Sequence, residues 1–318
     1  MPKTKQPADV DYINYLIAAR CDVSCVKVAD CYSTPDFSIS HDTFNRFLTR
    51  QSLTPETLWA EAEKYAERKT GWFVLDDTVL DKNHSEKIDL TYYQWSGKHH
   101  KVVKGIGLIT LIWTDGFVSF PIDYRIYDKD VDDKTKNDHL QEMVITAYNR
   151  GFTPSFIMFD SWYSGNENLK FINRLGWYFF TRVKKNRMVN PDAQGNVQVS
   201  TMRISEDGLE VHLKKYGFIR VFHSTNRKGV SRYWATNYIP MNNEDREILQ
   251  SICWTIENYP RAIKELCGVE KCQARTAIIQ RNHINCSLRA YLRLEVNQFL
   301  NGVTPYSAQW QITKVGIL

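Results

Sequence analysis

Two short apolar runs that each end on a carboxylate constrain this chain more than any other feature. Residues 156–159 read Phe-Ile-Met-Phe and lead directly into Asp160, and residues 72–75 read Trp-Phe-Val-Leu and lead into Asp76 and Asp77. Four apolar residues in a row are typical of a strand that is buried on both faces. In open α/β sheets the ligand crevice lies at the carboxyl ends of such strands. The two runs therefore predict neighbouring strand ends whose acids can hold a divalent metal.

The order of elements between residues 71 and 187 favours one fold. Strands are expected at 72–76, 102–113, 117–127, 156–160 and 177–183, and helices at 138–149 and 166–175. Asp115-Gly116 is a two-residue hairpin signal, so the second and third strands are expected to be antiparallel neighbours. This order is that of an α/β, RNase-H-like mixed sheet flanked by helices. In that fold the first and fourth strands are parallel neighbours, which would place Asp76 beside Asp160.

A β insertion is expected to interrupt this fold at residues 188–242. Consecutive strands are predicted at 196–200, 209–216, 218–224 and 232–239, with glycines in or near the turns between them. The insertion is interpreted as an all-β subdomain. Residues 243–318 then return to core helices and a C-terminal tail, with a helix at 243–266 that Pro260 is expected to kink and an amphipathic helix at 288–300.

The first 70 residues predict an N-terminal helical bundle. Apolar residues recur at helical spacing, a second helix is expected to begin at Ser38 or Ser40, and Thr54-Pro55 is a helix start. Three short helices resemble a small helix-turn-helix unit whose second helix would present Asp42, Asn45 and Arg46 outward. Three-helix bundles also serve other purposes, so DNA reading and a purely structural role stay open.

The charge and hydropathy of the chain limit the classes of partner that it can have. The formal net charge is +5 and the pI is about 8.7, which permits a polyanionic partner. The basic cluster after the last core strand, Arg182, Lys184, Lys185 and Arg187, is either a nucleic-acid contact or a solvated turn. No run reaches the roughly 18 apolar residues of a membrane helix, and Met1 leads into no apolar signal core. We therefore expect a cytosolic protein with no membrane partner.

A third acid is expected from a helix after the insertion, and Glu257 is the candidate. Trp254 and Ile256 can pack that helix onto the sheet, and Lys264 lies seven residues later on the same face. Two Mg²⁺ ions held by carboxylates can activate an attacking oxygen and stabilise a leaving oxygen in phosphodiester chemistry. The carboxylates would repel one another without metal, so their convergence would mark a metal site.

Three motifs resemble the DDE transposases of bacterial insertion sequences, in the subclass with a β-strand insertion. They are Asp76-Asp77-Thr78, Asp160-Ser161-Trp162-Tyr163, and Trp254-x-Ile256-Glu257 followed by Lys264. The resemblance covers roughly residues 70–275. It implies DNA cleavage and strand transfer at terminal inverted repeats with Mg²⁺, for which Mn²⁺ can substitute. It also implies a dimeric synaptic complex in the bacterial cytosol.

The resemblance also implies residue roles. Asp76, Asp160 and Glu257 match the metal-binding catalytic acids, with Asp77 the alternative to Asp76, and Lys264 matches the lysine of the signature Y-x2-R-x3-E-x6-K. The chain departs from that signature at Cys253 and Gln250, which stand where it has Arg and Tyr. Arg261, one turn after Glu257, is the candidate to contact the DNA phosphate instead.

Three further alternatives stay open at this point. Trp234, in the insertion, either stacks on an unpaired base or belongs to the protein core. The acids alone also fit a two-metal nuclease that cuts DNA without strand transfer. The missing Tyr and Arg fit a catalytically inactive DNA-binding remnant.

Overall fold

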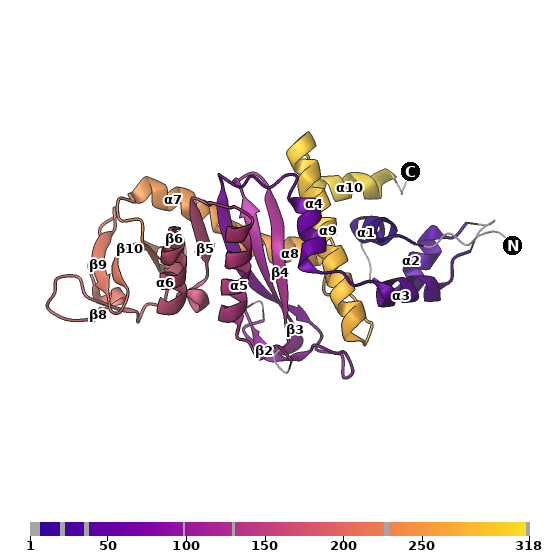
Figure 1. Cartoon of the computed structure of the whole chain (residues 1–318), viewed down its shortest axis with the longest axis horizontal. Helices are drawn as coiled ribbons and strands as arrows, with labels where there is room; N and C mark the ends of the chain where they lie inside the picture. The colour runs from indigo at the N-terminus through magenta and orange to yellow at the C-terminus, as the bar shows by residue number, and fades with distance from the viewer. Residues whose placement is uncertain are drawn as a thin grey trace.

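A mixed β-sheet runs through the molecule and carries helices on both faces. The computed structural model describes residues 7–19, 23–34, 38–97, 99–128, 131–225 and 229–315. Within these residues the main sheet has nine strands, in the order β2-β3-β1-β5-β6-β11-β10-β9, with β4 paired to β3 (Figure 1). The strands are β1 (Trp72–Asp81), β2 (Tyr92–Ser96), β3 (Lys101–Thr114), β4 (Ser119–Tyr127), β5 (Phe156–Phe159), β6 (Phe179–Val183), β9 (Leu209–Leu213), β10 (Gly217–Thr225) and β11 (Ser231–Thr236).

The central strands confirm the RNase-H-like arrangement. β3 pairs antiparallel with both β1 and β4, while β1 pairs parallel with β5 and β5 parallel with β6. The apolar runs of β1 and β5 are buried on both faces, as their sequences predict. Leu75 lies opposite Phe159 in the parallel register. The predicted strand neighbours are therefore correct. β2, which the sequence analysis does not predict, pairs with the first residues of β3.

The insertion lengthens the main sheet instead of forming a sheet of its own. β11 pairs antiparallel with β6, and β10 and β9 follow outward from it. Only β7 (Met188–Val189) and β8 (Val197–Gln198) form a separate two-stranded ribbon. The physical reason is that β6 would otherwise be an edge strand with unpaired backbone groups. The strands predicted at 209–216, 218–224 and 232–239 lie close to β9, β10 and β11, whereas the strand predicted at 196–200 is only β8 and a short 3-10 helix at Val199–Thr201. The strands of the predicted insertion are continuous with the main sheet.

The helices after the insertion differ from the prediction in their bounds. The expected helix at 243–266 is two helices, α7 (Asn243–Ile252) and α8 (Trp254–Glu265), which meet at Cys253, while Pro260 lies inside α8. α9 (Ala277–Asn301) begins well before the predicted residue 288 and is followed by α10 (Pro305–Val315). α5 (Lys136–Asn149) and α6 (Asn166–Arg174) lie close to their predicted positions. None of these helices, nor any other in the described residues, is long and apolar enough to cross a bilayer.

The N-terminal helices share a core with α9. They are α1 (Asp9–Ala18), α2 (Cys25–Tyr32), α3 (His41–Arg50) and α4 (Pro55–Ala62), and α2 was not predicted. Ser40 caps α3 and Pro55 is the first residue of α4, in agreement with the sequence analysis. α1, α3 and α4 all contact α9 at one end of the molecule (Figure 1). The first and last helical segments are therefore packed together, although they are far apart in the sequence.

Asn282 of α9 is the polar anchor of this packing. Its amide nitrogen donates to the carbonyl oxygens of Leu48 at 2.7 Å and Gln51 at 2.8 Å, and its amide oxygen accepts from the Leu53 N–H at 3.0 Å. The side chain is 2% exposed. One residue thus satisfies three backbone groups in the connection between α3 and α4.

We predict that Asn282→Ala lowers the free energy of unfolding by about 2–4 kcal/mol, because buried backbone groups lose their partners. Urea unfolding followed by circular dichroism measures this. Asn301→Ala is the matched control on the same helix, since the exposed Asn301 amide bonds only to Asn297. A loss below about 1 kcal/mol for Asn282→Ala would contradict the anchoring role.

Candidate active site

Two carboxylates converge at the end of β5. Asp76 and Asp160 each follow the last residue pair of the parallel register, Leu75 and Phe159, so they lie side by side. β5 ends before Asp160, but β1 continues to Asp81, so the prediction that the first strand ends at Asp76 was wrong. Burial raises the pKa of the Asp76 carboxyl well above its usual range, the charges of Asp77 and Asp160 raise it further, and the Lys264 ammonium opposes them. Asp160 itself is exposed to solvent. The site thus concentrates negative charge around one desolvated carboxyl.

Asp77 faces the other side of the sheet. Successive side chains of a strand point to opposite faces, so Asp76 and Asp77 cannot both face the same helix. The Asp77 carboxylate forms an ion pair with Lys136, the first residue of α5. Burial and the adjacent Asp77 charge raise the pKa of the Tyr163 phenol. Of the two neighbouring acids, Asp76 is therefore the one that shares a side with Asp160 and Lys264.

Lys264 reaches the site from α8, which crosses the opposite face of β1 from α5. Its ammonium donates to the Val79 carbonyl oxygen at 2.6 Å and lies 3.3 Å from a Glu270 carboxylate oxygen. The side chain is 11% exposed. Glu270 was not predicted from the sequence, because it lies in the turn after α8, where no periodic pattern marks it. Glu270 and Val79 together hold the Lys264 charge beside Asp76.

Glu257 is exposed on α8, between the two ends of the site. Burial raises the pKa of the Cys253 thiol at the start of α8. The Arg182 charge opposes this rise and the Asp160 charge adds to it. The start of α8 therefore lies near Asp160. The later turn that carries Lys264 lies near Asp76. Among the described residues, no three His, Cys, Asp or Glu side chains come together as a metal-binding group. The structure therefore brings Asp76 and Asp160 together and leaves Glu257 at the surface of the helix that crosses them.

The donor set nevertheless fits a divalent metal. Carboxylate oxygens are the hard ligands that Mg²⁺ prefers, and a few of them suffice because the ion keeps water and substrate in its shell. Burial, followed by the charges of Asp77 and Asp160, raises the pKa of the Asp76 carboxyl, and the Lys264 ammonium opposes this rise. A bound cation would relieve that repulsion.

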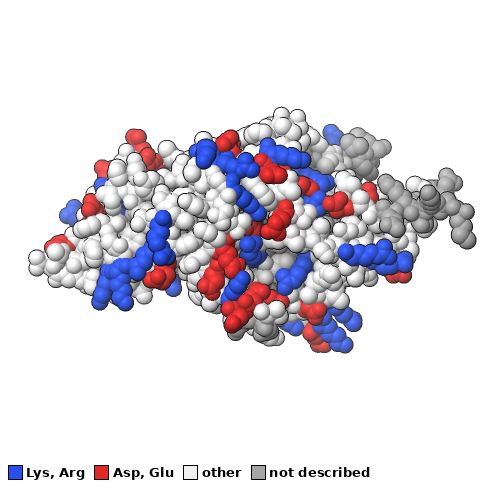
Figure 2. All heavy atoms as spheres, in the orientation of Figure 1, with Lys and Arg blue, Asp and Glu red and all other residues white. Residues whose placement is uncertain are grey.

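A basic groove begins next to Asp160. Its volume is about 570 Å³, and it is lined by Lys184, Arg187, Lys214, Lys215 and the exposed Trp162. Lys and Arg side chains gather over this end of the molecule, around α6 (Figure 2). Lys185 is also exposed, while Arg187 is partly buried and donates to the Asn166 amide oxygen. The cluster predicted from the sequence is therefore largely at the surface, which fits both a nucleic-acid contact and a solvated turn.

Of the further predicted DNA contacts, Trp234 is placed differently from its expected role and Arg261 is at the surface. Trp234 is 3% exposed and stacks on Phe180 with ring centroids 4.9 Å apart. The Arg182 guanidinium lies 6.0 Å from the same indole. No base can reach this ring, so base stacking by Trp234 was wrong and the core alternative is correct. Arg261 is exposed on α8. Its charge acts on Tyr306: burial and the hydrogen bond to Glu265 raise the pKa of Tyr306 to about 12, and the Arg261 charge opposes that rise.

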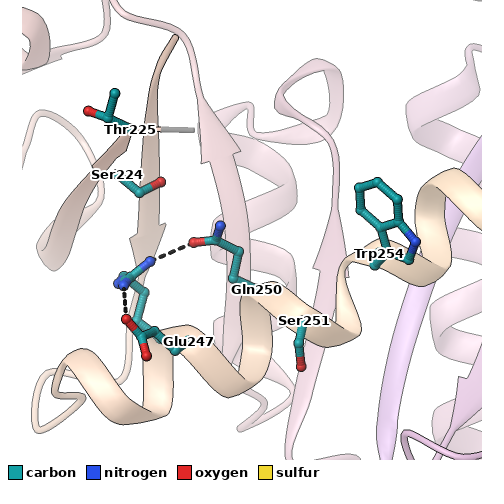
Figure 3. A pocket seen from close by; sticks show the side chains of 7 residues that line it. Ser224, Thr225, Glu247, Gln250, Ser251 and Trp254 are labelled. Atoms are coloured by element: carbon teal, nitrogen blue, oxygen red, sulfur yellow. Dashed lines mark hydrogen bonds and ion pairs between the residues drawn. The ribbon is translucent and has the colours of Figure 1, made fainter. Parts of the chain in front are cut away.

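A second groove lies where α7 meets α8, beside the end of β10 (Figure 3). It has a volume of about 620 Å³, and the exposed indole of Trp254 lies on the α8 side of it. The Arg246 guanidinium donates to Gln250, Glu247 and Asn243. Gln250 stands where the transposase signature has Tyr. Its side-chain oxygen accepts a hydrogen bond from Arg246, which was not singled out from the sequence.

Comparisons with known proteins bear on the fold and the family. The sequence pattern of the family described as DDE superfamily endonuclease matches residues 15–205, more than half of the chain. This match includes Asp76 and Asp160 and ends before Glu257. No curated protein matches the sequence.

Among solved structures, the chain is similar to the piggyBac transposase in its synaptic complex with hairpin DNA. The TM-score is 0.55 at 10% identity, over 99% of this chain and 73% of that chain. The Drosophila P element transposase strand transfer complex gives 0.32 at 10% identity, over 61% and 48% of the two chains. The Mos1 strand transfer complex gives 0.20 at 14% identity, over 55% and 58%. At such identities, the piggyBac likeness shows a shared fold.

We predict that Asp76→Asn stabilises the metal-free protein at neutral pH. Because the pKa of Asp76 is higher in the folded protein than its ordinary value of 3.8, ionising this carboxyl costs stability as the pH rises above that value. A neutral amide avoids the cost. We expect a gain of about 1 kcal/mol or more near pH 7, which shrinks toward pH 4. Urea unfolding in EDTA across this pH range measures it.

The control for this prediction is Asp30→Asn, which makes the same charge change at an exposed position of α2. It should leave stability nearly unchanged at every pH. Equal stability of the Asp76→Asn variant and the unmodified protein at neutral pH would show that the Asp76 carboxyl is not under charge repulsion.

Proposed function

Because the chain belongs to the DDE superfamily endonucleases, we propose that it is a transposase that cuts DNA and joins the cut strand to a target. The observation that carries the proposal is the convergence of Asp76 and Asp160 on neighbouring parallel strands of an RNase-H-like sheet. The structural likeness to piggyBac transposase, whose structure is a synaptic complex with hairpin DNA, supports it. The proposed element is a bacterial insertion sequence, and the proposed location is the bacterial cytosol.

In this proposal Asp76, Asp160 and Glu257 hold two Mg²⁺ ions, with Mn²⁺ as a substitute. When bound, such ions activate the attacking oxygen and stabilise the leaving oxygen of the phosphodiester. Asp76 is preferred to Asp77 because Lys136 already neutralises Asp77 on the other face of the sheet. Glu257 lies on the same stripe of α8 as Lys264, so a change of rotamer can bring its carboxylate toward the two aspartates.

The remaining residues of the site place positive charge beside Asp76 or offer contacts to DNA. Lys264 keeps a positive charge beside Asp76, and Glu270 orients that lysine through its ion pair. The exposed Lys184 and Lys185, with Arg187 and Arg182 behind them, offer contacts to DNA phosphates close to Asp160. Arg261 offers a further contact along α8.

The proposed organisation follows from these roles. Residues 71–187 and the helices of 243–318 form the catalytic core, and 188–242 form the insertion that carries α8 to the site. Residues 1–70 are proposed to contact DNA through α3, on which Asp42, Asn45 and Arg46 are exposed. A dimer is proposed to hold two element ends together.

We predict that Asp160→Asn and Glu257→Gln each reduce DNA cleavage at least about a thousandfold, because losing a metal ligand removes roughly 4 kcal/mol of transition-state stabilisation. Binding of the element ends should persist. Cleavage and joining are measured on labelled inverted-repeat DNA with Mg²⁺, and binding by gel shift in EDTA. Glu244→Gln, at an exposed position of α7, is the matched control and should keep full activity.

Three results would count against this assignment. Cleavage that survives in Asp160→Asn would place the chemistry elsewhere. Products of hydrolysis without any joined target would favour a two-metal nuclease. Tight DNA binding with no cleavage by the unmodified protein would favour an inactive remnant.

A further inference from the structure

The sheet projects past the catalytic acids as an aromatic hairpin. β5 ends opposite Leu75, but β1 continues to Asp81 and stays paired with β3 as far as Gly105. β2 then pairs with the first residues of β3. Large apolar side chains are unusually exposed on this extension: Tyr93 is 75% exposed, Trp95 63% and Val102 58%. A cluster of exposed aromatic residues on one short hairpin indicates a binding surface.

The strand register places these aromatic side chains on the catalytic face. Trp95 lies opposite Val102, and Tyr93 lies opposite Lys104. Asp76 lies opposite Thr110 on the same strand, β3, and the pairing of β1 with β3 is unbroken. Because side chains two residues apart share a face, the residues at 102, 104 and 110 of β3 all point the same way. Tyr93 and Trp95 are therefore on the Asp76 side of the sheet.

The alternate residues of β2 are already occupied by the protein. The Tyr92 hydroxyl donates to the Gln94 side chain, and the Tyr92 ring packs edge-on against Tyr127. The Gln94 amide donates to the Gly105 carbonyl. One face of β2 therefore packs against the protein, whereas Tyr93 and Trp95 on the other face lie in solvent.

The hairpin is also a basic segment. From Leu90 to Thr114 the sequence contains no aspartate or glutamate. Lys101 is exposed at the start of β3, and the Lys104 ammonium lies nearby, held by the Ser85 carbonyl oxygen at 3.0 Å. The acid at the end of this extension, Asp81, is paired with His99 at 3.1 Å. Aromatic rings beside lysine charge suit a polyanion that carries flat rings and do not suit a basic or purely apolar partner.

We propose that Tyr93 and Trp95 form a stacking platform for unpaired nucleobases of the DNA strand that passes through the active site. This rests on the proposed function and extends it to the form of the substrate. Tyr93 and Trp95 lie level with β3 residues that are six and eight positions from Thr110, which is about 20–26 Å at roughly 3.3 Å per residue. At the duplex rise of roughly 3.4 Å per nucleotide this span corresponds to about six to eight nucleotides, and an extended unpaired strand covers it with fewer.

The test measures DNA binding without chemistry. Fluorescence anisotropy in EDTA follows binding of a labelled oligothymidine of about 20 nucleotides and of a duplex of the same length. We expect Tyr93→Ala/Trp95→Ala to weaken binding of the single strand about tenfold or more, since each stacked base contributes roughly 1–3 kcal/mol. Duplex affinity should change much less. Tyr93→Phe/Trp95→Phe, which keeps the rings, should restore single-strand binding.

Phe218→Ala is the matched control, because Phe218 is 62% exposed on β10 but lies outside this hairpin. Unchanged single-strand affinity in the double alanine variant would overturn the proposal. So would an equal loss on duplex DNA, or a loss of self-association in sedimentation velocity as the only effect. If the unmodified protein binds single strands through the platform but never cuts, the proposed function fails and the platform stands.

Discussion

The parallel pairing of β1 with β5 is the interaction on which the site depends. It aligns Leu75 with Phe159 and so places Asp76 and Asp160 side by side, where β5 ends and β1 continues alone beside β3. Bringing two carboxylates together is unfavourable without a cation. The apolar residues that precede them are fully buried and contribute about 1.5–3 kcal/mol each, so the fold can tolerate the repulsion at its edge.

The sequence predicts this part of the molecule well because local pattern and global position agree there. An apolar run that ends on an acid marks both a buried strand and the residue at its carboxyl end. The choice between Asp76 and Asp77 was open because one residue of register reverses the face of a side chain. Only the pairing partners decide it: Lys136 lies beside Asp77, and Lys264 beside Asp76. Glu257 was predicted from a motif, and its role as the third acid stays a prediction, because no motif specifies a rotamer.

The remaining misses have physical causes. The first half of α9 buries polar side chains such as Asn282 and His283, which bond to distant backbone, so it lacks the apolar stripe that marks a helix. β2 carries exposed Tyr93 and Trp95 on one face and therefore does not resemble a core strand. The joining of β11 to β6 depends on an edge that exists only after the sheet has formed. These features are nonlocal, and a local sequence window does not contain them.

The packing of α1, α3 and α4 on α9 has a consequence for synthesis. The Leu48 carbonyl is bonded by a side chain 234 residues later in the chain. At about 5–20 residues per second, a ribosome needs roughly 10–50 s to make the intervening chain. During that time the sides of α1 and α3 that face α9 lack this partner, and they are open to chaperones or to aggregation. α1 and α3 are thus made long before the helix that completes their burial.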